Sequence, residues 1–163
     1  MLDTAPGLFV ALESSGVGQT IRQSTWIYMA ANVGHILALV MFAGAVAVLD
    51  LRMAGAFAAT SPGIVLNRTR RVVVLAFLAL VFTGAVLFTA EASHVIMNRV
   101  FQVKLSLIAL GLLNVALFEI FTAPKVRDLP PLAPLPAAAK RAGIASIAIW
   151  LMVAACGRSI AYF

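Results

Sequence analysis

The sequence has few charged residues and a single cysteine. Only 11% of its 163 residues are charged and 63% are hydrophobic, whereas soluble domains are about 25% charged and about 45–50% apolar. A water-soluble core of this size cannot bury that excess, so the composition excludes a soluble globular fold. Cys156 is the only cysteine, which excludes an intramolecular disulfide and leaves no CxxC or CxxCH pattern for zinc or covalent haem.

Other absences narrow the chemistry. The chain has no glycine-rich phosphate loop, HExxH pair or nucleophile elbow, so hydrolytic chemistry of the soluble type is not expected. The net charge is +6, but the basic residues flank apolar blocks and form no surface stripe, so nucleic acid is not an expected partner. Asp3 and Glu13 stand where a signal peptide would carry positive charge, so we expect no cleaved export signal.

The sequence does contain four apolar blocks. A transmembrane helix needs about 20 mostly apolar residues, and the blocks predict helices at about 26–50, 72–92, 101–122 and 142–160. Residues 6–23 mix apolar and polar side chains, as a helix lying in the headgroup plane would. Residues 124–136 are rich in proline, which predicts an extended, exposed loop. We therefore expect one all-α transmembrane domain over residues 1–163, a four-helix bundle in a lipid bilayer.

The distribution of Lys and Arg predicts the orientation. Eight basic residues lie on one side of the predicted bundle: Arg52, Arg68, Arg70, Arg71, Lys125, Arg127, Lys140 and Arg141. The other side has Arg22, Arg99, Lys104 and Arg158. Because Lys and Arg favour cytoplasmic loops, both termini are expected outside. In a bacterium this means the periplasmic side of the inner membrane.

Ionisable side chains inside apolar spans are costly, so each one is a candidate functional residue. A helical rise of about 1.5 Å per residue places His35, Lys104 and Arg158 at similar heights in the outer half of the bilayer. Small residues beside His35 allow another helix to approach, which predicts that His35 points into the bundle. Asn32 shares the face of His35.

His35 admits several roles: an axial ligand of haem b, a metal ligand, a proton relay, or a packing histidine bonded to Asn32 or to a neighbouring helix. His94 is the candidate second haem ligand, or else a solvated histidine at the interface. The helical rise separates the two Cα heights by roughly 12 Å. Helix tilt, or an inward fold of the turn before His94, would have to close that gap.

Lys104 and Arg158 are candidate partners for an anion at the same level. Haem propionates, a quinone oxygen or an acidic lipid headgroup would each be stabilised there. The alternative is that both side chains extend to the outer surface, or that one pairs with Glu91.

Three further polar residues are explained without a ligand. Thr83 and Asn114 lie near the middle of predicted helices, where hydrogen bonds between helices account for them. Glu119 lies about one turn from the cytoplasmic end of its helix and is expected to meet the basic loops.

The chain resembles a known family through several runs of sequence. These are the segment ALESSGVGQTIRQSTWIYMAANVGHILALVMFAGAVAVLDLRMAG, then TGAVLFTAEA, FQVKLSLIALGLLN and the terminal GRSIAYF. They are similar to an uncharacterised family of small bacterial four-helix membrane proteins, a domain of unknown function, with distant similarity to b-type cytochrome membrane subunits. The resemblance covers nearly the whole chain. It supports the topology and the selection of His35 and Arg158, and His94 is not part of the matched pattern.

The leading hypothesis is a small b-type cytochrome-like membrane subunit. Its haem would lie in the outer half of the bundle and pass electrons between a quinone and a membrane or periplasmic partner. One alternative is a non-catalytic accessory subunit of a larger membrane complex, and another is transport of a metal ion such as copper. Electron transfer or an accessory role is expected in preference to a stand-alone enzyme, and a homo-oligomer stays open.

Overall fold

A computed structural model of the chain describes residues 5–162, so Asp3 and Phe163 lie outside the described residues. The described part is helical, with no strand in residues 5–162. It contains four helices that are long and apolar enough to cross a membrane, which confirms the predicted all-α architecture of a multi-pass membrane protein. These spans are α3 (Thr25–Ala54), α4 (Pro62–Ala90), α6 (Arg99–Leu117) with its continuation to Val126, and α8 (Ala137–Ser159) with its continuation to Tyr162.

Local sequence signals explain where these helices begin and end. The Ser24 side chain accepts a hydrogen bond from the backbone N–H of Ile27, capping the start of α3. Helix α3 ends at Gly55, whose φ of 116° lies in the left-handed region that favours glycine. Pro62 occupies the first turn of α4, where its missing N–H is not needed.

Two helices begin earlier than the apolar blocks predict. Helix α4 starts at Pro62 and not near residue 72, and α8 starts at Ala137 and not near residue 142. Hydropathy marks only the part of a helix that lies in hydrocarbon, whereas α4 begins at Pro62 and includes Arg68, Arg70 and Arg71 before its apolar run.

The segments outside the spans also differ in detail from the prediction. Residues 6–23 form two short helices, α1 (Gly7–Ser14) and α2 (Gly16–Gln23), because the backbone is extended at Ser15. The proline-rich segment 124–136 begins inside a short helix, α7 (Ala123–Val126), and is otherwise not α-helical.

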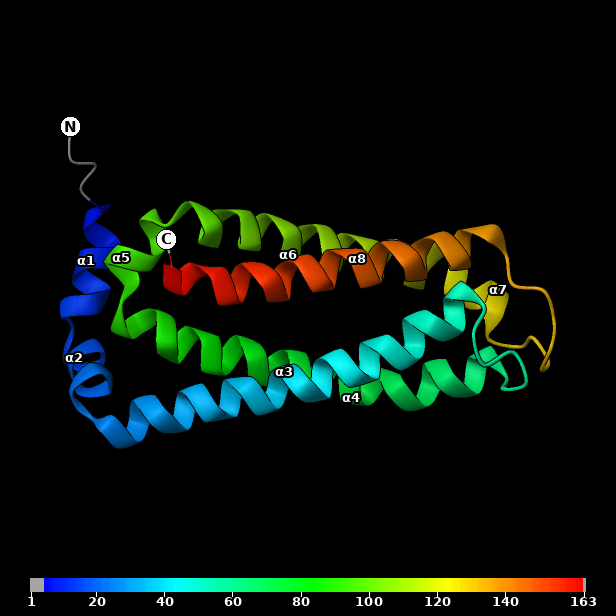
Figure 1. The fold of residues 1–163 in the computed structure, drawn as a ribbon, viewed down its shortest axis with the longest axis horizontal. Coiled ribbons are helices and arrows are strands. Elements are labelled where there is room, and N and C mark those ends of the chain that lie inside the picture. The colour runs from blue at the N-terminus through cyan, green and yellow to red at the C-terminus, as the bar shows by residue number, and fades with distance from the viewer. Residues whose placement is uncertain (1–4, 163) are drawn as a thin grey trace.

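The four spans run along the length of the molecule, with short helices at one end and loops at the other (Figure 1). The terminal end carries α1, α2, α5 (Ala92–Met97) and the last turn of the chain. The loop end carries the connection between α3 and α4 and the segment after α7. Helix α3 packs against α4 and α8, and α8 packs against α6, whereas α4 and α6 make few contacts with each other. Side chains join α4 to α6 and its continuation at two places, where the rings of Phe88 and Phe101 stack and where Arg70 pairs with Glu119. Between these places the seam between the two helices is loosely packed.

The loop end contains the larger buried core. Its hydrophobic cluster comprises Met53, Leu66, Phe118, Ala123, Val126, Leu135 and Ala139. Arg52, expected among the loop cations, is 1% exposed, and its Nε donates to the carbonyl oxygen of Thr60 at 2.8 Å. Elsewhere many large apolar side chains face outward, including Leu37, Leu75 and Leu151 at 60% or more. This outward apolar surface suits a lipid environment.

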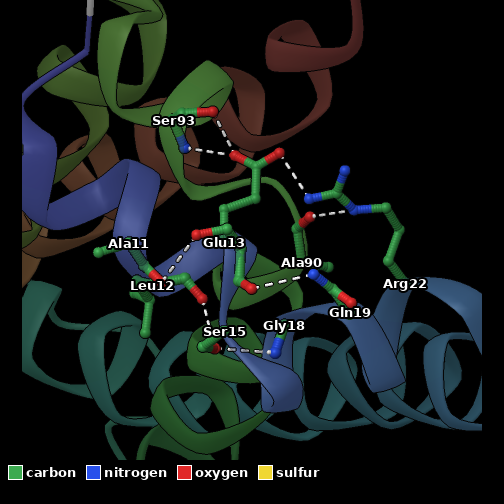
Figure 2. A network of polar contacts seen from close by, with 10 residues as sticks. Ala11, Leu12, Glu13, Ser15, Gly18, Gln19, Arg22, Ala90 and Ser93 are labelled. Carbon is green, nitrogen blue, oxygen red and sulfur yellow. Dashed lines mark hydrogen bonds and ion pairs between the residues drawn. The ribbon is translucent and has the colours of Figure 1, made fainter.

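A polar network fastens α1 and α2 across the terminal end (Figure 2). One carboxylate oxygen of Glu13 accepts hydrogen bonds from the backbone N–H and the hydroxyl of Ser93. The other accepts from the Arg22 guanidinium at 2.5 Å. Arg22 also donates from its Nε to the carbonyl oxygen of Ala90 at 3.0 Å. Glu13 thus ties both short helices to the turn between α4 and α5.

This network predicts a pH-dependent contribution to stability. The hydrogen bonds from Ser93, together with the charge of Arg22, lower the pKa of Glu13 below its usual value of 4.5. A carboxylate with a lowered pKa stabilises the folded state above its unfolded pKa, and this stabilisation is lost as the pH falls through the folded value.

We expect Glu13→Gln to reduce the unfolding free energy by about 1 kcal/mol at pH 7, since the pair is partly solvated. Unfolding of both proteins in detergent, followed between pH 7 and pH 3, measures the difference. It should be constant at neutral pH and shrink below about pH 4.5. A difference that grows on acidification would contradict the assignment.

Candidate functional site

His35 lies at the interface between α3 and α4. Its Nδ1 is 2.8 Å from the hydroxyl oxygen of Thr83 on α4, which confirms that a hydrogen bond between helices involves Thr83. The Thr83 hydroxyl itself donates to the carbonyl oxygen of Ala79 at 2.7 Å. Because a hydroxyl has one proton, Nδ1 of His35 is the donor in their contact when the Thr83 hydroxyl donates to Ala79. In the neutral ring of that tautomer, Nε2 carries the free lone pair.

Lys104 is the other predicted site residue that faces the bundle. Its side chain is half-buried, and its Nζ lies 3.5 Å from the position that a Cβ on Gly157 of α8 would occupy. The ammonium group of Lys104 therefore lies beside α8, at a distance that would be an ordinary van der Waals contact for a Cβ at Gly157.

The remaining predicted site residues lie on the surface. Arg158 is exposed, donates to the hydroxyl of Tyr162 and stacks over its ring at 4.7 Å. Asn32 is exposed on α3, and His94 is exposed on α5, which packs mainly on α1 and α6. The structure therefore keeps His35 and Lys104 half-buried and leaves His94, Arg158 and Asn32 exposed.

A cavity of about 380 Å³ lies nearer the loop end, between all four spans. Its walls are mostly apolar. They come from α3 (Phe42, Val46, Leu49, Asp50, Met53), from α4 (Leu66, Arg70, Val73, Val74, Phe77, Leu78), from α6 and its π-helical continuation η1 (Leu112, Asn114, Val115, Phe118, Glu119), and from α8 (Ala142, Gly143, Ser146, Trp150).

Three aromatic rings form one wall of this cavity. The ring centroids of Phe42 and Trp150 are 4.8 Å apart, and those of Phe77 and Trp150 are 6.1 Å apart, both with edge-to-face geometry. Such edge-to-face pairs hold the rings in defined orientations. The wall is therefore a fixed aromatic surface contributed by α3, α4 and α8.

Polar groups from three helices meet the cavity at its loop-end side. Asp50 is 7% exposed, and its Oδ2 has no hydrogen-bond partner among residues 5–162. Ser146 of α8 is 4% exposed. Asn114 of α6 donates to the carbonyl oxygen of Ala142 at 3.1 Å, which confirms its predicted bond between helices.

Gly143 allows this grouping to form. A Cβ at that position would lie 2.7 Å from the backbone oxygen of Asp50, so only glycine permits α8 to approach α3 so closely here. Ser146 is one turn further along α8, on the same side. The close approach thus places a hydroxyl next to a buried carboxyl group.

The cavity opens onto the lipid-facing surface between α4 and α6. Four of its wall residues are also substantially exposed: Val74 and Leu78 on α4, and Leu112 and Val115 on α6, at 42–57%. These side chains form the rim of the mouth, which coincides with the loosely packed part of the seam.

An ion pair crosses the seam on the loop-end side of the mouth. Arg70 of α4 donates through two guanidinium nitrogens to the Glu119 carboxylate in η1 (Phe118–Thr122). Arg127 donates to the same carboxylate at 3.4 Å. The predicted meeting of Glu119 with basic residues is confirmed. π-Helical turns within α-helices are frequent at functional sites, and this one places Glu119 at the mouth.

Asp50 is the functional candidate that reasoning from the sequence missed. Asp50 is the last residue of the predicted helix 26–50, and a carboxylate that follows an apolar block is itself an intramembrane signal. Its burial depends on Gly143 of a distant helix, which the spacing within α3 does not reveal.

Comparison with known protein families shows which family this chain belongs to. A family model matches residues 8–163. The chain belongs to DUF6644, a family of unknown function. The predicted membership of a family without an assigned function is confirmed. No curated protein and no solved structure matches this DUF6644 chain.

Proposed function

We propose that this DUF6644 protein is an electron-transfer membrane subunit that takes a quinone from the bilayer into the cavity between α4 and α6. The observation that carries the proposal is the cavity itself: an apolar chamber of about 380 Å³ with a lipid-facing mouth and a partnerless buried carboxyl oxygen on its wall. Ligand sites are typically apolar chambers with a few convergent polar groups.

The walls suit a quinone ring better than an acyl chain. The edge-to-face rings of Phe42, Phe77 and Trp150 offer surfaces on which a flat ring can pack. The carboxyl of Asp50, with Ser146 beside it, offers hydrogen bonds to a ring oxygen. An acyl chain would leave Oδ2 of Asp50 without a partner, which is unfavourable in a buried site.

Tryptophan fluorescence tests the proposal. The chain has 2 tryptophans, of which Trp150 lines the cavity and Trp26 is 77% exposed near the terminal end. A Trp26→Phe variant in nanodiscs therefore reports on the cavity alone. Titration with decylubiquinone should quench Trp150 with saturation. Quenching that rises linearly to the highest quinone content, as for collision in the bilayer, would refute a bound quinone.

Binding of a haem by His35 is a second candidate function, and the hydrogen bonding of the His35 imidazole ring favours it. In the tautomer that donates from Nδ1 to Thr83, Nε2 has a free lone pair, and this arrangement is typical of histidines that bind a metal. His35 would be one axial ligand, with Lys104 facing a propionate. Within the described residues 5–162, no second histidine lies beside His35. A reduced-minus-oxidised spectrum with a Soret band that His35→Ala abolishes would support the haem, and colourless protein from haem-replete cells would exclude it.

We further propose insertion into a bacterial inner membrane with the terminal end in the periplasm. The support is the excess of Lys and Arg toward the loop end, eight against four. Labelling of Ala58→Cys, in a Cys156→Ser background, with a membrane-impermeant maleimide tests the orientation. Intact cells should leave this cysteine unlabelled, and labelling before lysis would reverse the topology.

A further inference from the structure

Two groups of polar side chains lie within the spans, at different depths. His35 and Lys104 are nearer the terminal end, and Asp50, Asn114 and Ser146 are nearer the loop end. We propose that Asp50 binds the polar ring of the quinone, so that the ring lies near the loop end and the tail leaves through the mouth between α4 and α6. This inference rests on the proposed function.

The carboxyl of Asp50 has unused hydrogen-bonding capacity. Only 7% of the residue is exposed, and Oδ2 has no hydrogen-bond partner in the described chain. A bound ligand would supply the missing partner. A buried polar atom left without a partner is unfavourable by about 1–3 kcal/mol. A hydrogen bond between Asp50 and a ring oxygen would remove this penalty and thereby favour binding.

The group near the terminal end is less suited to bind the ring. Nδ1 of His35 is already bonded to Thr83, and the His35 ring packs against α4, with its Cε1 only 3.4 Å from where a Cβ on Gly84 would lie. Neither His35 nor Lys104 lines the cavity. A quinone ring at that level would have to separate α3 from α4.

The position of the mouth sets the direction of the tail. Helix α4 runs away from the loop end, so Val74 and Leu78 lie beyond Arg70 toward the membrane centre. The ion pair between Arg70 and Glu119 crosses the seam on the loop-end side. A tail can therefore leave past Val74 and Leu78 but not past the ion pair.

The depth of Asp50 suits a ring that exchanges protons with water. Asp50 is four residues before the end of α3 at Ala54, which corresponds to about 6 Å along the helix. A ring bound there would lie close to the loop-end boundary of the hydrocarbon layer, with its isoprenoid tail in the hydrocarbon.

Photolabelling with an azidoquinone and binding to Asp50 variants test the inference together. In the Trp26→Phe background, label should appear in peptides that contain Asp50 or residues 112–119. Asp50→Leu should weaken saturable quenching by decylubiquinone at least tenfold. Asp50→Asn, which keeps a hydrogen-bonding side chain of the same size, should weaken it less than about threefold. Asp128→Leu is the matched control: Asp128 is exposed and does not line the cavity, so this variant should bind like the parent.

Each outcome decides a separate question. Label in peptides containing His35 or Lys104, or unchanged binding by Asp50→Leu, would overturn the role of Asp50 while the cavity stands. The absence of saturable quenching in the parent itself would instead refute the proposed function. Competition by excess phospholipid, with no preference for quinone, would identify an acyl chain as the occupant. Thermal melting of each variant identifies any loss that comes from unfolding.

Discussion

Gly63→Ala is expected to lower the melting temperature by roughly 10 °C, from a destabilisation of about 3 kcal/mol. A Cβ at Gly63 would lie 2.0 Å from the carbonyl oxygen of Arg127 and 2.9 Å from its carbonyl carbon. Because these are backbone atoms, no rotation of a side chain relieves the clash. The first turn of α4 would have to separate from the segment after α7, with loss of the hydrogen bond from the Ser61 hydroxyl to the Leu129 carbonyl.

Gly44→Ala is the matched control for this prediction. Gly44 also lies within a spanning helix, but nothing lies within 4 Å of an added Cβ. Its melting temperature should stay within a few degrees of the parent, since alanine in place of an exposed helical glycine changes stability by at most about 1 kcal/mol. Equal melting of both variants, measured by tryptophan fluorescence in detergent, would show that the loop end is not packed as described.

Leu112→Phe is expected to abolish saturable quenching of Trp150 by decylubiquinone while leaving the protein folded. Leu112 lies on the rim of the mouth, is 44% exposed and lines the cavity. A larger ring there would narrow the opening, and its exposed position allows the ring to be accommodated without compressing a core. We therefore expect binding to weaken at least tenfold with little change in melting temperature.

Leu113→Phe provides the control at the neighbouring position. Leu113 is 54% exposed and does not line the cavity, so the same substitution adds the same ring toward lipid. Its quinone titration should match that of the parent. Equal weakening by both variants would indicate a general effect on the bilayer or the fold, and no weakening by Leu112→Phe would place the quinone elsewhere.

The spans could be predicted because one physical property determines them. A run of about 20 apolar residues must cross the bilayer as a helix, and four such helices are present. The helix ends were less predictable, since α4 extends through Arg68 and Arg71 into the polar layer. Charge counting likewise treated Arg52 as a loop cation, although the loop folds over it and Thr60 accepts its hydrogen bond.

The cavity could not be predicted because it depends on which helices are neighbours. The small residues beside His35 correctly indicated that it faces another helix, whereas depth along the helices did not show that Lys104 would be half-buried and Arg158 exposed. The seam follows from the order of neighbours: α4 packs mainly on α3 and α6 mainly on α8, so few contacts join α4 to α6. Asp50 becomes buried only through the approach of Gly143, and Arg158 turns outward because Tyr162 lies one turn away on the same face.

The most direct test is a crystal structure grown from lipidic mesophase with a bromine-labelled quinone, in which anomalous scattering locates the bromine atom. The account expects one bromine site inside the cavity, on a ring within hydrogen-bonding distance of Asp50, with tail density leaving between α4 and α6. A bromine site beside His35 and Lys104, or a cavity filled by an acyl chain at saturating quinone, would contradict it.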